Sequence, residues 1–77
     1  MEINLLAFGQ IAEITGQSTW KMVGINDTNT LLEKLEVQFP ALVKIKYSIA
    51  VNKKVIQENT TINENDTIAL LPPFSGG

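Results

Sequence analysis

The clearest alternation of apolar and polar positions lies at the start of the chain, over residues 2–8. Apolar side chains at every second position fall on one side of an extended segment, namely Ile3, Leu5 and Ala7. The other side carries Leu6 and Phe8. The pattern predicts a strand with one fully apolar face, and its second face also needs cover.

Other segments rich in β-forming residues predict four further strands, at 18–23, 47–51, 54–56 and 67–71. Asn52-Lys53 separates two of them and predicts a tight turn. Between the first two strands, Gly9 and Gly16 bracket a segment that predicts a short helical turn. The segment 59–66 is polar and predicts a loop, which Ile62 anchors to the core.

The apolar period changes to three and four residues after position 27, at Leu31 or Leu32, Leu35 and Phe39. Thr30 and Glu33 have the spacing of a capping box, and Pro40 discourages continuation. These features predict one amphipathic helix over about residues 28–39.

The order strand, strand, helix, strand, strand, strand predicts an α+β domain in two layers. We expect a ubiquitin-like β-grasp, with a mixed sheet of about five strands packed on one main helix, and with the first and last strands side by side. Pro72-Pro73 lacks two backbone donors and ends the last strand. Residues 1–72 are therefore the expected domain, and residues 73–77 are an expected flexible tail.

The composition narrows the possible chemistry. Cys, His and Arg are absent from the 77 residues, so a thiolate nucleophile and Cys or His metal sites are excluded. The net charge of −2 leaves no basic stripe, and we expect no nucleic-acid partner. The N-terminus lacks the features of a signal peptide, and no apolar stretch approaches a membrane span, so we expect a cytoplasmic protein without a membrane partner.

The candidate reactive group is the carboxylate of Gly77. Gly76 and Gly77 carry no side chains, so the tail, with Ser75, can enter a narrow channel. A carboxylate is a poor electrophile and must be activated, for example as an acyl-adenylate. No phosphate-binding glycine motif occurs, so we expect a partner to bind ATP and this chain to bind no cofactor and no metal.

The ending Ile68-Ala69-Leu70-Leu71-Pro72-Pro73-Phe74-Ser75-Gly76-Gly77 resembles that of the small subunits of molybdopterin synthase. The segments 6–14 and 50–52 are also similar to that family. The sequence departs from the family near Ala12, where Arg is frequent, near Asn65, where Gly is frequent, and near Phe74, where a small aliphatic residue is frequent.

The resemblance implies a sulfur carrier in molybdenum cofactor biosynthesis. An E1-like adenylyltransferase would adenylate Gly77, and a sulfur donor protein would convert it to a thiocarboxylate. The tail would then insert into the large subunit of a heterotetramer, which holds the active site, and give its sulfur to cyclic pyranopterin monophosphate. The chain itself would be a non-catalytic subunit.

We also expect a partner interface made of Phe8, Val55, Leu71 and Phe74. Alternation turns Phe8 away from the helix, the first and last strands bring it near Leu71, and the resemblance places Val55 beside them. Two other functions stay open, a thiamine-pathway sulfur carrier and a ubiquitin-like interaction module or modifier. The Pro-Pro spacer and the chain length favour the molybdopterin carrier.

Overall fold

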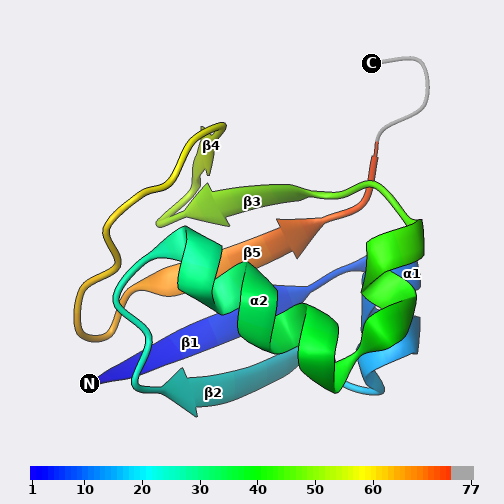
Figure 1. Cartoon of the computed structure of the whole chain (residues 1–77), viewed down its shortest axis with the longest axis horizontal. Helices are drawn as coiled ribbons and strands as arrows, with labels where there is room; N and C mark the ends of the chain where they lie inside the picture. The colour runs from blue at the N-terminus through cyan, green and yellow to red at the C-terminus, as the bar shows by residue number, and fades with distance from the viewer. Residues whose placement is uncertain (74–77) are drawn as a thin grey trace.

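The computed structural model of the chain describes residues 1–73. They form a mixed sheet of five strands in the order β2-β1-β5-β3-β4 (Figure 1). The strands are β1 (Glu2–Ala7), β2 (Thr19–Val23), β3 (Ser48–Val51), β4 (Lys54–Ile56) and β5 (Thr67–Leu71). All five strands that the sequence predicts are present. The expected tail lies outside the described residues, apart from Pro73.

The first and last strands lie side by side and run parallel, as predicted. The other three pairings, β1 with β2, β3 with β4 and β3 with β5, are antiparallel. The turn between β3 and β4 has positive φ at Asn52 (50°) and Lys53 (76°), which the primed hairpin turns require. The tight turn predicted at Asn52-Lys53 is therefore confirmed.

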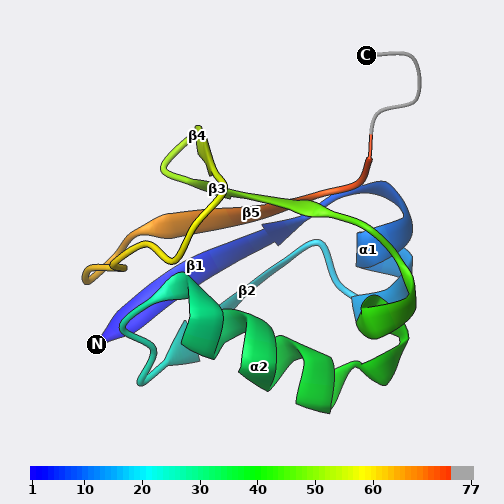
Figure 2. The same ribbon diagram turned by 45° about the horizontal axis from the view of Figure 1, so that its top comes forward.

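One helix, α2 (Thr28–Gln38), covers one face of the sheet and leaves the other face without a helix (Figures 1 and 2). The capping box predicted at Thr30 and Glu33 is wrong. The N-cap is Asp27, in extended conformation, whose carboxylate accepts a hydrogen bond of 2.9 Å from the backbone N–H of Thr30. The helix begins three residues earlier than that box requires, and Phe39 caps its other end.

Two short helical segments close one end of the layer pair. α1 (Gly9–Thr15) links β1 to β2, and the 3-10 helix η1 (Pro40–Lys44) links α2 to β3. α1 stops at Gly16, which takes the left-handed conformation that favours glycine (φ 77°). In residues 1–73 no helix has the length and the apolar character needed to cross a membrane.

The core lies between α2 and the sheet. Its fully buried aliphatic side chains come from all parts of the described chain: Ile3, Leu5, Ile11, Ile25, Leu31, Leu35, Leu42, Ile62, Ile68 and Leu70. Each side chain of this size stabilises the fold by about 1.5–3 kcal/mol when it leaves water. The predicted inner face of β1 is confirmed, and so is the anchoring of the 59–66 loop by Ile62.

Candidate docking face and the start of the C-terminal segment

The sheet face opposite α2 presents a row of small and apolar side chains across four strands. The register pairs Leu6 of β1 with Ala69 of β5, Ala69 with Ala50 of β3, and Ala50 with Val55 of β4. Because side chains alternate along a strand, these four residues share one face, and the core residues next to them occupy the other. The row is thus fixed by strand pairing.

This face is hollowed. The residues that line the hollow come from the end of β1 and the residue that follows it, from the β3–β4 hairpin and from β5, and we call this region the open-face hollow: Leu6, Phe8, Ala50, Asn52, Lys53, Val55, Thr67, Ala69 and Leu71. Phe8 is 46% exposed and Val55 is 52% exposed, so both side chains leave much of their apolar surface open to solvent. The hollow therefore offers apolar surface to a partner.

The apolar character increases toward one end of the hollow. Near the beginning of β1 and β5 the face is polar, with Asn4 paired to Thr67. Toward the end of both strands the hollow is lined by apolar side chains, those of Leu6, Phe8 and Leu71. Because β1 and β5 are parallel, both strands end at the same edge, so the apolar end of the hollow lies where the chain leaves β5.

The three residues at this exit contact three different parts of the molecule. Leu71 lines the open-face hollow, and Pro73 lines a second groove between α2 and the β3–β4 hairpin. Pro72 packs against Gly9, where a Cβ atom would lie 3.4 Å from Cγ of Pro72. Gly9 also holds a positive φ of 56°, the backbone conformation that favours glycine.

Polar contacts hold the other end of the hollow. The side-chain amide of Asn52 donates a hydrogen bond of 2.9 Å to Asp66, and its oxygen accepts one of 2.9 Å from the backbone N–H of Thr67. The hydrogen bond from Asn52, followed by one from the backbone N–H of Asn63, lowers the pKa of Asp66. The carboxylate therefore stays ionised and ties the β3–β4 turn to the start of β5.

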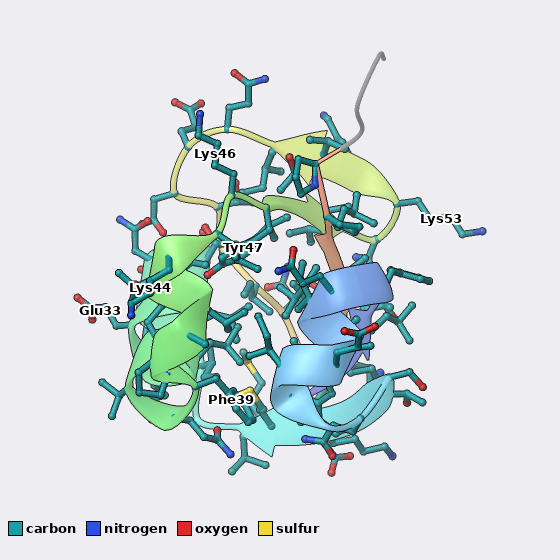
Figure 3. All side chains as sticks on the ribbon, turned by 90° about the vertical axis from the view of Figure 1, so that its right-hand side faces the viewer. Glu33, Phe39, Lys44, Lys46, Tyr47 and Lys53 are labelled. Carbon is teal, nitrogen blue, oxygen red and sulfur yellow. The ribbon has the colours of Figure 1, made fainter. Side chains whose placement is uncertain are left out.

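The second groove is different in character. It is lined by both charge signs, Lys46 with Glu36 and Glu58, and by apolar residues from α2 and β4. Tyr47 lies between α2 and the sheet (Figure 3), and its hydroxyl donates a hydrogen bond of 3.1 Å to Glu36. Burial, together with this carboxylate, raises the pKa of Tyr47, so its hydroxyl stays protonated. Among the residues of 1–73 that line this groove, no side chains form a reactive arrangement.

The structure brings together three of the residues predicted for the interface. Phe8, Val55 and Leu71 line the same hollow, although Leu71 is only partly exposed. Phe74, Ser75, Gly76 and Gly77 lie outside the described residues. Two features were not predicted from the sequence: the floor of the hollow at Ala50 and Ala69, and the contact between Gly9 and Pro72. Lys53 also lines the hollow, and the sequence alone did not indicate a role for it.

The ThiS family model matches residues 5–77. The chain is 31% identical over 81 residues to the molybdopterin synthase sulfur carrier subunit of Arabidopsis thaliana, a match that covers 100% of this chain and 84% of that protein.

Solved structures agree with the β-grasp architecture. A chain of the protein-protein complex of subunits 1 and 2 of molybdopterin-converting factor from Helicobacter pylori is 28% identical, with a TM-score of 0.75 and 100% coverage of both chains. SAMP1 from Haloferax volcanii has a TM-score of 0.80 at 22% identity, again over 100% of both chains, which shows the shared fold alone. By its sequence, over nearly its whole length, this chain belongs to the ThiS family.

Proposed function

We propose that this protein is the sulfur carrier subunit of a molybdopterin synthase. The observation that carries the proposal is the position of the exit from β5, beside an exposed apolar hollow. A partner that covers the hollow also receives the residues that follow Pro73. The full-length similarity to a plant protein named as such a subunit supports the same function.

The proposed chemistry takes place at the carboxylate of Gly77. A carboxylate oxygen attacks the α-phosphate of ATP held by an E1-like adenylyltransferase, and pyrophosphate leaves. A sulfide equivalent from a sulfur donor protein then attacks the acyl carbon, and AMP leaves with its bonding electron pair. The product is a thiocarboxylate, which is a better nucleophile than the carboxylate and can pass its sulfur to cyclic pyranopterin monophosphate on the large subunit.

The role proposed for the hollow is to offset the entropy lost when the C-terminal residues become ordered in the partner. Ordering costs about 1–2 kcal/mol per residue in backbone freedom. Full burial of a large apolar side chain contributes about 1.5–3 kcal/mol, and Phe8, Val55 and Leu71 provide three of them. In this proposal Phe74 adds a fourth apolar contact.

The test compares two Val→Asp variants that differ in position. Val55→Asp places a charge in the hollow, whereas Val37→Asp places one on the exposed side of α2, where Val37 is 82% exposed. We expect Val55→Asp to weaken binding to the large subunit by about tenfold or more, because a carboxylate would be buried against apolar surface. Val37→Asp should bind normally, and thermal unfolding should show both variants folded.

Equal binding of both variants to the large subunit would contradict the proposed docking face.

Intact-mass analysis of the protein from cells separates the two other functions considered above. A protein joined through Gly77 to a lysine would identify a modifier. A thiocarboxylate that supports thiazole formation, and no molybdopterin, would identify a thiamine-pathway carrier.

A further inference from the structure

Lys53 is the one ionisable side chain among the residues that line the open-face hollow within the described part of the chain. The other residues that line it are apolar or neutral. In the groove on the helix side, by contrast, Lys46 shares the lining with Glu36 and Glu58. The hollow therefore has an uncompensated positive charge at its border.

The fold holds Lys53 in this place. Lys53 is the second central residue of the β3–β4 turn, and its φ is 76°. The neighbouring Asn52 is hydrogen-bonded to Asp66 and Thr67. In Figure 3 the side chain of Lys53 points away from the side of the molecule that carries Glu33 and Lys44. The ammonium group is therefore available at the face opposite α2.

The carboxylates of the described residues do not neutralise Lys53. Asp66, whose carboxylate is bonded to the β3–β4 turn, already accepts hydrogen bonds from the side chain of Asn52 and from the backbone N–H of Asn63. The two ion pairs in residues 1–73 join Lys21 to Glu2 and the N-terminus to Glu64. From residue 40 to residue 57 the sequence has four lysines and no Asp or Glu.

We propose that the partner surface that covers the open-face hollow presents a carboxylate to Lys53, next to an apolar group that fills the hollow. This inference rests on the proposed function and specifies the chemistry of the partner. Covering the hollow removes water from the border, and an ammonium that loses water without gaining a partner weakens binding. A carboxylate at this position fixes the orientation of the two proteins and speeds their encounter.

The experiment measures association of the full chain with the purified large subunit at low and high salt. The variants are Lys53→Glu, Lys53→Arg and the matched control Lys44→Glu, which makes the same change in net charge on η1. We expect Lys53→Glu to weaken binding by about tenfold at low salt and by less at high salt. Lys53→Arg and Lys44→Glu should stay within about twofold of the original protein.

Each outcome decides the inference. Equal weakening of binding by Lys53→Glu and Lys44→Glu would mean that only the net charge matters. No weakening by either variant would mean that the partner has no carboxylate facing Lys53. Both results overturn the inference and leave the proposed function standing. If the original protein does not bind the large subunit, the proposed function fails and the inference fails with it. A dimer of this chain that Lys53→Glu dissociates would assign the hollow to a second copy and would also overturn it.

Discussion

At the scale of single residues, three residues other than glycine hold a positive φ within residues 1–73: Asn52, Lys53 and Asn65. Asn65 has φ 67° and lies in the turn before β5. Asparagine tolerates this conformation better than other residues with a side chain. Asparagine at this position therefore accommodates the left-handed backbone of the turn before β5.

The backbone of Asn65 provides a clean test, because its N–H donates a hydrogen bond of 2.7 Å to the carbonyl of Glu2 and would do so in any variant. We expect Asn65→Ala to lower the free energy of unfolding by about 1 kcal/mol, because alanine is strained at positive φ. Asn65→Gly should stay within about 0.5 kcal/mol of the original. Chemical denaturation measures both, and equal losses would show that the conformation is not responsible.

At the scale of elements, the start of α2 depends on contacts with a distant loop. Asn59 accepts a hydrogen bond of 2.9 Å from the backbone N–H of Asn29 and donates one of 3.2 Å to the carboxylate of Asp27. Asp27 also forms a β-bridge with Thr61. These contacts hold Asp27 in extended conformation, so it becomes the cap.

This explains what the sequence could and could not predict about the elements. Alternation predicted β1, and the three- and four-residue period predicted α2, because both patterns depend on local spacing. Local sequence could not decide between Asp27 and Thr30 as the N-cap, because both residue types can cap a helix. The contact that favours Asp27 comes from Asn59, which lies 32 residues away in the sequence. The floor of the hollow, at Ala50 and Ala69, was missed because it depends on the register of β3 and β5.

The cap predicts a pH dependence of stability. Hydrogen bonds from the side chain and backbone of Thr30, and then from Asn59, lower the pKa of Asp27 below its ordinary value of 3.8. A carboxylate with a lowered pKa stabilises the fold above its unfolded-state pKa, and this contribution is lost as the pH falls through the folded-state pKa. We therefore expect the midpoint temperature of thermal unfolding to decrease when the pH is lowered below about 4.

Asp27→Asn tests this assignment, because asparagine can still accept the hydrogen bond from Thr30 but has no charge. The difference in thermal midpoint between the original protein and Asp27→Asn should narrow as the pH is lowered from neutrality toward about pH 2. Two curves that stay parallel over this range would show that Asp27 does not cause the pH dependence.

At the scale of the whole molecule, the two faces of the sheet have different surroundings. The helix and the inner sheet face bury the core, while the uncovered face presents the open-face hollow beside the exit from β5. The sequence predicted this arrangement from the element order and from the apolar side chains on both faces of β1. The residues to which we assign the chemistry, Gly76 and Gly77, lie outside the described residues.

The most direct test of the account is intact-mass analysis after incubation with ATP, sulfide and an E1-like adenylyltransferase. We predict that the full chain gains the mass difference of one oxygen replaced by one sulfur, and that a chain lacking Gly76 and Gly77 folds normally but gains nothing. A full chain that stays unchanged under conditions in which a known carrier is converted, or a truncated chain that still gains sulfur, would contradict the assignment of Gly77 as the sulfur-carrying residue.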